Sequence, residues 1–255
     1  MPFFSTSGIL LRKIEYGDYD LILVFLTKSK GKISVIAKNA KKSVKRFAGI
    51  LEPFFMLDIV CKVGKGNLAV LCEADLINSY GKIRTDINKT AYASYWVEII
   101  SSRIEDGCQN SKLFDLLNHV LDVINKDCFL NKEVSILFLM KFLLLWGTVP
   151  LLEKCCVCGI LVEEIKSNKI RFEIEEGGIL CSRCTKVKIK KKSMFISKGT
   201  IKRLLWIKRS TLLKADRVCF PLLSLKESLF LLESFTGFYL GKEFKSLKFL
   251  NIIKR

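Results

Sequence analysis

Hydrophobic and polar residues alternate in short runs through the first 80 residues of the chain. Aliphatic, β-branched and aromatic residues fill these runs, and clusters of Gly, Asp, Ser and Lys separate them. The pattern predicts five short strands, at residues 8–14, 21–27, 33–37, 53–62 and 68–77. Five strands in so short a segment favour a small barrel, and a five-stranded, partly open barrel whose long loops bind oligonucleotides is one known solution.

From about residue 83 the hydrophobic positions recur at three- and four-residue steps, which is the period of a helix. The apolar stretch 134–152 is interrupted by Lys141 and by a Gly-Thr-Val-Pro break, so it is too short for a membrane span and predicts a buried core helix. Residues 199–209 and 224–240 also read as helices, the second opening with a Ser224–Glu227 capping box and closing at Gly241. We therefore expect an α+β protein with a barrel at 1–80 and a helical domain at 81–255.

Two Cys-x-x-Cys pairs carry the strongest motif in the chain. They are Cys155 with Cys158 and Cys181 with Cys184. Two such pairs supply four soft ligands for a tetrahedral Zn²⁺, and four thiolates leave no open coordination position, so the predicted zinc is structural. Gly159, Gly177 and Gly178 supply tight turns beside the pairs, and Cys156 is expected to point elsewhere. We place a zinc-ribbon insert at 153–186.

The chain has 43 Lys and Arg against 25 Asp and Glu, a formal net charge of +18. The excess is focused in two places. No acid occurs between Asp20 and Glu52, and the segment 186–217 holds twelve basic residues and a single acid. Focused positive charge predicts a polyanionic partner, and nucleic acid fits better than a membrane surface because the basic stretches are not evidently amphipathic.

The first basic segment contains the residues that we expect to bind DNA. They are Lys32, Lys38, Lys41, Lys42, Lys45, Arg46 and Phe47. Lysine and arginine would neutralise phosphates, and Phe47 is a candidate for stacking on a base. Tyr16 and Tyr19 flank the first turn, and we expect them to pack in the core instead.

Signatures of catalysis are missing from the sequence. His119 is the only histidine, and no Walker A, G-x-S-x-G or H-E-x-x-H motif occurs. The protein is therefore expected not to be an enzyme. Cysteine usage of this kind, without a signal-peptide pattern, predicts a reducing, cytoplasmic location.

The residues together resemble the family of the bacterial DNA repair and recombination mediator RecO. The resemblance runs through Tyr16-Gly17-Asp18-Tyr19-Asp20, the segment 37–43, Trp146-Gly147-Thr148-Val149-Pro150, both cysteine pairs and the segment 245–250. It covers nearly the whole chain in the same order, although Asn39 stands where the family usually has glycine.

The resemblance implies an N-terminal oligonucleotide/oligosaccharide-binding (OB) barrel, a helical domain and an inserted four-cysteine zinc ribbon. It also implies binding of single- and double-stranded DNA, annealing of complementary strands, and contact with the C-terminal tail of the single-stranded DNA-binding protein SSB. With RecR, and often RecF, such a protein helps to load RecA onto SSB-coated DNA, at the nucleoid of the bacterial cytoplasm.

Other functions remain open from the residues alone. A zinc-ribbon nucleic-acid-binding accessory module would bind DNA or RNA without mediator activity. A nuclease would use the paired glutamates 163–164 or 175–176 with Mg²⁺, and a peripheral membrane protein would use the basic surface alone.

Overall fold

The computed structural model describes residues 2–43, 46–47, 49–64, 68–127, 131–185, 192–215 and 218–253. The chain divides into two compact units. Unit 1 comprises Met1–Lys126 and Lys245–Arg255, and unit 2 comprises Asp127–Phe244.

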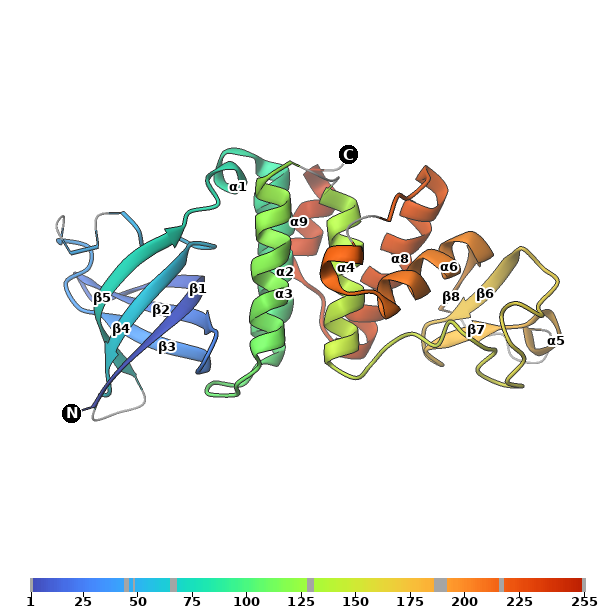
Figure 1. Ribbon diagram of the computed structural model, residues 1–255, viewed down its shortest axis with the longest axis horizontal. Helices are drawn as coiled ribbons and strands as arrows, with labels where there is room; N and C mark the ends of the chain where they lie inside the picture. The colour runs from blue at the N-terminus through green and yellow to red at the C-terminus, as the bar shows by residue number, and fades with distance from the viewer. Residues whose placement is uncertain are drawn as a thin grey trace. The chain divides into compact units, whose positions relative to one another are not determined.

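The N-terminal half of unit 1 is a closed five-stranded barrel (Figure 1), which confirms the predicted fold class. Its strands are β1 (Phe3–Tyr16), β2 (Asp20–Thr27), β3 (Gly31–Ala37), β4 (Met56–Lys62) and β5 (Ala69–Asn78). They follow one another around the barrel as β1-β2-β3-β5-β4, and a short parallel pairing between β3 and β5 closes it.

Strand alternation builds the barrel core. Along β2, Leu21, Leu23 and Phe25 point inward and are buried together with residues of the other four strands. Strand β1 begins five residues earlier than the sequence predicts, because residues 3–7 pair with the last half of β4. Because of these additional residues, β1 extends to the end of the barrel at which β4 finishes.

The helical part of unit 1 packs on the outer surface of the barrel near the β2–β3 turn, while the outward residues farther along β2 and β3 are half-buried. Ile9 and Leu26 pair across β1 and β2, alternate with core residues, and are nevertheless fully buried. At the β2–β3 turn, Gly31 adopts a left-handed backbone (φ 69°) and lies directly against the carbonyl group of Cys108. The Lys32 Nζ and Asp106 Oδ1 atoms are 3.1 Å apart, and the backbone N–H of Gly107 donates to the Lys32 carbonyl.

Four helices complete unit 1: α1 (Gly81–Thr85), α2 (Ile87–Arg103), α3 (Ser111–Asn125) and α9 (Lys245–Ile253). Helix α9 comes from the end of the chain and packs against α2. The carboxylate of Glu98, on α2, accepts hydrogen bonds from the backbone N–H groups of Lys245 and Ser246 and from the Ser246 hydroxyl. It thus satisfies donors that the first turn of a helix leaves without partners.

Unit 2 combines helices with a small sheet. The helices are α4 (Asn131–Leu145), α5 (Ser182–Thr185), α6 (Lys198–Arg209), α7 (Leu212–Ala215) and α8 (Leu222–Leu240). The strands are β6 (Lys169–Glu173), β7 (Gly178–Leu180) and β8 (Ser193–Ser197), and they form a sheet in the order β7-β6-β8. Helix α4 is the predicted core helix, and its buried Lys141 donates to the backbone carbonyls of Lys208 and Ser210. Among the described residues, no helix has the length and hydrophobicity needed to cross a membrane.

The capping box predicted at Ser224 is wrong. Helix α8 begins at Leu222, and Ser224 lies buried within its first turn. The Glu227 carboxylate instead accepts from the backbone N–H and hydroxyl of Ser197 and from the Thr200 hydroxyl, so it binds the start of α6. At the other end of α8, Gly241 has the left-handed conformation that was predicted.

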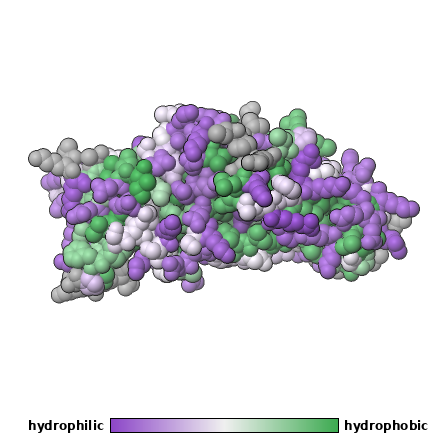
Figure 2. Space-filling model, in the orientation of Figure 1, coloured by the Kyte–Doolittle hydropathy of each residue, from purple (hydrophilic) through white to green (hydrophobic). Residues whose placement is uncertain are grey.

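The surface of the barrel is not uniformly polar. Figure 2 shows hydrophobic surface at the end of the barrel where the N-terminal strand begins in Figure 1. Phe3 and Val63 are the exposed large hydrophobic residues there.

Replacing Gly31 by alanine tests the packing of the helical segment on the barrel. Gly31→Ala adds a Cβ that would collide with the Cys108 carbonyl, in addition to straining a positive φ. Gly17→Ala is the matched control, since Gly17 also has a positive φ (55°) but nothing lies within 4 Å of the new Cβ. Urea unfolding should show a loss of about 1–2 kcal/mol for the control and roughly 2–3 kcal/mol more for Gly31→Ala. Equal losses would contradict the close approach.

Candidate metal centre and nucleic-acid interface

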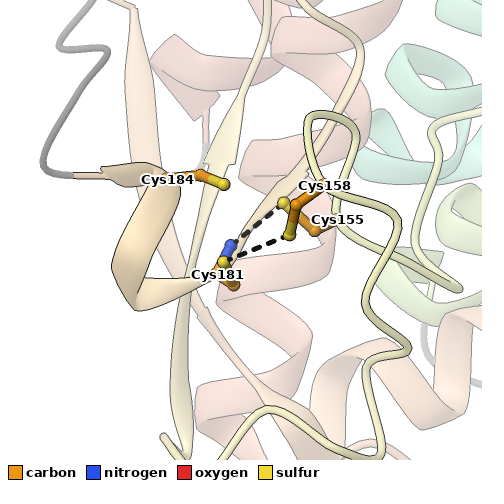
Figure 3. Close-up of side chains that lie close together, drawn as sticks. All are labelled: Cys155, Cys158, Cys181 and Cys184. Carbon is orange, nitrogen blue, oxygen red and sulfur yellow. Dashed lines mark hydrogen bonds between the residues drawn. The ribbon is translucent and has the colours of Figure 1, made fainter.

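Four cysteines of unit 2 converge on one point (Figure 3). Cys155 and Cys158 lie on the segment that precedes β6, while Cys181 and Cys184 lie at the end of β7 and in α5. Their four Sγ atoms all lie within 4.8 Å of one another. The structure therefore brings together all four predicted ligands.

The spacing of the sulfur atoms matches a tetrahedral site. The Sγ atoms of Cys158 and Cys181 are 3.6 Å apart, and metal–sulfur bonds of about 2.3 Å in a tetrahedron place sulfur atoms at roughly that separation. Gly159 turns the chain back after the first pair with a positive φ of 76°, and its N–H donates to the Cys155 carbonyl at 3.0 Å. The four cysteines can therefore hold one metal ion.

Backbone N–H groups near the cluster lower the pKa of two of its thiols, which favours the thiolate form that binds a cation. Burial alone would raise the pKa of Cys155, but the backbone N–H groups of Cys158, Cys181 and Val157 outweigh it and lower that pKa to about 6. The pKa of Cys181 is likewise lowered, against its burial, chiefly by the backbone N–H of Cys184. The neighbouring sulfur of Cys181, together with burial, stabilises the proton on Cys184 and raises the Cys184 pKa to about 12. A cation would displace that proton.

Cys156 is not part of the cluster. Its backbone N–H donates to the Ile179 carbonyl, and its Cβ lies close to Gly178, where any side chain would crowd it. The expectation that Cys156 points elsewhere is confirmed, and this residue is a natural control for experiments on the other four.

The basic segment after β3 lies at the end of the barrel where β1 turns into β2. We call this end the loop rim and define it by residues 15–20, 38–43 and 46–47. Lys38, Lys41, Lys42 and Arg46 are exposed there. Two of these residues already have partners: the Lys41 ammonium pairs with Glu15 at 3.0 Å, and the Arg46 guanidinium donates to the carbonyls of Leu71 and Cys72.

Two of the residues expected to bind DNA are used by the fold instead. Phe47 is only 2% exposed and packs in the barrel core, so its ring is not available for stacking on a base. The Lys32 side chain is 16% exposed and pairs with Asp106, so it holds the helical segment on the barrel. Lys45 falls outside the described residues.

Tyr16 and Tyr19 are exposed, contrary to the expectation that they are core residues. Both are exposed large side chains at the β1–β2 turn. The Lys42 ammonium lies 3.5 Å from the centroid of the Tyr19 ring, a cation–π contact. The signal in the sequence was their position beside Gly17-Asp18, since a tight turn at a barrel end leaves its flanking side chains in solvent.

The second basic segment lies in unit 2. Of its basic residues, 186–191 and Arg217 fall outside the described residues. The described part includes α6, where Trp206 is 52% exposed and forms one wall of a pocket of about 500 Å³. Lys202, Arg209 and Lys214 also line this pocket, together with Leu205, Glu163, Ser210 and Thr211. We call it the α6 pocket. Leu205 and Trp206 supply its apolar surface, and its charged lining residues are basic except for Glu163.

The site and fold define a class: a barrel protein with a basic, tyrosine-bearing rim and a cluster of four cysteines that can hold a metal ion. Family models assign the two parts separately. "Recombination protein O N terminal" matches residues 1–80, and "Recombination protein O C terminal" matches residues 84–248.

Known relatives agree with both models over the full length. The chain is 40% identical to the "DNA repair protein RecO" of Desulfatibacillum aliphaticivorans over 257 residues, which cover 100% of this chain and 99% of the relative. It is 37% identical to that of Desulfosudis oleivorans over 261 residues (100% and 99%) and 33% identical to that of Syntrophus aciditrophicus over 252 residues (98% and 96%). The chain belongs to the RecO family of DNA repair proteins.

Cysteine substitutions test the metal centre. Cys158→Ser should lower the metal content of the purified protein, measured by atomic emission, from about one ion per chain to near zero, because it removes one of four soft ligands. Cys156→Ser removes a neighbouring thiol that lies outside the cluster, and this variant should retain the full metal content. Loss of metal in both variants, or in neither, would contradict the assignment of the four ligands.

Proposed function

We propose that this protein is a recombination mediator that acts without being an enzyme. It binds single- and double-stranded DNA, anneals complementary strands and, with RecR and RecF, helps to load RecA onto DNA coated with SSB, in the cytoplasm at the nucleoid. The observation that carries the DNA-binding part is the loop rim, where exposed lysines stand beside exposed tyrosines. Membership of the family supports the rest.

The annealing step follows from charge. Two strands repel each other through their phosphates, and a protein that neutralises both lowers this repulsion while their base edges stay free to pair. Lys38, Lys41 and Lys42 would hold one strand at the loop rim. Part of the basic segment 186–217, outside the α6 pocket, would hold a second strand or a duplex. Neither role needs nucleotide hydrolysis, which agrees with the missing Walker A motif.

Zinc is the metal that we assign to the four cysteines. Two Cys-x-x-Cys knuckles with closely spaced sulfurs are typical of structural Zn²⁺ sites. This ion is redox-inactive and is readily bound by four thiolates. With four protein ligands no position remains for water or substrate. The ion would therefore stabilise unit 2 and take no part in strand chemistry.

The α6 pocket is the site that we propose for the C-terminal tail of SSB. An acidic tail that ends in apolar residues needs an apolar floor and a basic rim. Leu205 and Trp206 supply the first, and Lys202, Arg209 and Lys214 supply the second. Lys141 supports the pocket from behind, since it donates to the carbonyls at the end of α6.

The alternative is a zinc-ribbon nucleic-acid-binding module without mediator activity. It shares the loop rim and the metal centre with the mediator. Such a module does not need to bind a partner's peptide tail. The presence of the α6 pocket therefore favours the mediator.

Annealing of SSB-coated strands tests the proposed function. Two complementary oligonucleotides, each saturated with SSB, are mixed with the protein in the absence of nucleotide and Mg²⁺. Annealing much faster than with SSB alone is expected, since the protein needs only to neutralise and align the strands. Binding to bare DNA without annealing would leave the accessory-module alternative, and cleavage of the strands on adding Mg²⁺ would indicate a nuclease.

Charge reversal at the loop rim should weaken DNA binding without regard to sequence. Replacing Lys38, Lys41 and Lys42 by glutamate removes three phosphate contacts and should lower the slope of log affinity against log salt by about two for single strands. Glu15→Gln should instead raise the affinity for DNA about two- to three-fold. It releases Lys41 from an exposed ion pair that contributes less than about 1 kcal/mol. An unchanged salt slope in the triple variant would exclude this rim as the DNA site.

Truncation of the pocket wall should separate SSB-dependent from SSB-independent activity. Trp206→Ala removes an exposed aromatic surface and should weaken binding of an acidic tail peptide roughly ten-fold or more, measured by fluorescence anisotropy. Annealing of bare strands should be retained. Leu213→Ala is the control, since Leu213 is exposed nearby but does not line the pocket. Loss of bare-strand annealing in Trp206→Ala would assign the pocket to DNA instead.

A further inference from the structure

Three segments meet at the end of the barrel opposite the loop rim. They are the start of β1, the β2–β3 turn and the end of β4. We call this end the N-terminal rim and define it by residues 2–5, 28–30 and 62–63. Strand β1 joins the two ends, since it begins at the N-terminal rim with Phe3 and finishes at the loop rim with Tyr16.

Phe3 presents an aromatic ring to solvent at the N-terminal rim. Its side chain is 61% exposed, although phenylalanine is ordinarily buried. Its backbone is well fixed, because Phe3 pairs with Lys62 across β1 and β4 and the Val63 N–H donates to the Pro2 carbonyl at 3.0 Å. The exposed ring is thus held by the sheet, and Val63 adds exposed apolar surface beside it.

Each of the two phenylalanines at this rim has a lysine near its ring. The Lys62 ammonium lies 5.8 Å from the centroid of Phe3, and the Lys30 ammonium lies 5.8 Å from the centroid of Phe4. Phe4 faces the barrel core and is half-buried, so only Phe3 offers an open face. The turn that carries Lys30 is held by the hydrogen bond from the Ser29 hydroxyl to Thr6 at 2.8 Å.

The barrel segments that form this rim carry positive charge only. Residues 2–5, 28–30 and 62–63, which define the rim, contain three lysines and no acid. Of these lysines, Lys28 and Lys30 are exposed and Lys62 is half-buried. An exposed aromatic ring among lysines is the composition of a surface that stacks bases and neutralises the phosphates between them.

We propose that the N-terminal rim is a second binding site for single-stranded DNA on the barrel, in which Phe3 stacks on a base while Lys62 and Lys30 hold flanking phosphates. The proposal rests on the DNA-binding function proposed above and extends it to surfaces at both ends of one barrel. A bound base would replace the ammonium group over the Phe3 ring, and the freed Lys62 would move to the phosphate. Duplex DNA, whose bases are stacked inside the helix, would not use the ring.

The test compares single-stranded and duplex binding of the full chain. Phe3→Ala and Phe3→Leu are titrated by anisotropy with a labelled dT oligonucleotide and with a duplex of equal length, over a range of salt concentrations. Phe230→Ala is the matched control, because Phe230 is 57% exposed on α8 of unit 2 and lies in none of the segments proposed to bind DNA. Phe3→Leu keeps an apolar residue in the strand and guards against a simple loss of folding.

The proposal expects both Phe3 variants to bind the single strand about ten-fold more weakly, with an unchanged salt slope and unchanged duplex binding. Lys62→Gln should instead lower the slope for the single strand by about 0.7. A 5-iodouracil oligonucleotide should photocrosslink to the peptide that contains Phe3. Wild-type affinity in both Phe3 variants, or equal losses for single strand and duplex, would overturn the proposal while leaving the proposed function intact. Failure of the unmodified protein to bind single strands would overturn both.

Discussion

The packing of the helical segment on the outward face of β2 and β3 decides which surfaces of the barrel remain for a ligand. In an OB barrel this face and the loops beside it are the usual place for an oligonucleotide. Here Gly31 touches the Cys108 carbonyl, Lys32 pairs with Asp106, and the outward-pointing Leu26 is fully buried. A strand of DNA cannot lie on the part of this face, near the β2–β3 turn, that the same chain already covers. The two ends of the barrel, with Tyr16 and Tyr19 at one and Phe3 at the other, are where exposed aromatic rings and lysines coincide.

Positive charge at the loop rim is partly engaged within the protein, and the strength of those contacts determines whether DNA can compete for it. Lys41 pairs with an exposed Glu15, and such surface pairs contribute about 0–1 kcal/mol. A phosphate can therefore take over Lys41 at little cost. Arg46 differs, because its guanidinium makes three contacts with the carbonyls of Leu71 and Cys72 and so ties the loop to β5. Its role is more structural than its charge suggests, whereas Lys38 and Lys42 need to break no ion pair that the structure shows among the described residues.

The sequence predicts best where many residues repeat one signal. All five strands, the helical period after residue 83 and the four clustered cysteines were found in this way, because alternation and Cys-x-x-Cys spacing are local. Single side chains were harder to place. Phe47 lies among lysines but is buried, Tyr16 and Tyr19 are apolar enough for a core but lie at a turn, and Lys32 meets Asp106 only after the intervening chain has folded back. Likewise, residues 3–7 pair with β4, and Glu227 binds the start of α6. Each of these depends on a partner distant in sequence, which no local pattern encodes.

In unit 2 the cysteine cluster and the α6 pocket are joined by a short series of contacts. The strands of the sheet β7-β6-β8 are only three to five residues long, and so small a sheet is not stable by itself. It depends on the four cysteines at one side and on α8 at the other, where the rings of Phe172 and Phe235 meet at a centroid distance of 5.9 Å. Helix α8 in turn fixes the start of α6 through Glu227, and the far end of α6 forms the pocket. A metal ion bound by these cysteines would therefore stabilise the surface proposed to bind a protein partner, although the cysteines belong to neither of the surfaces proposed to bind DNA on the barrel.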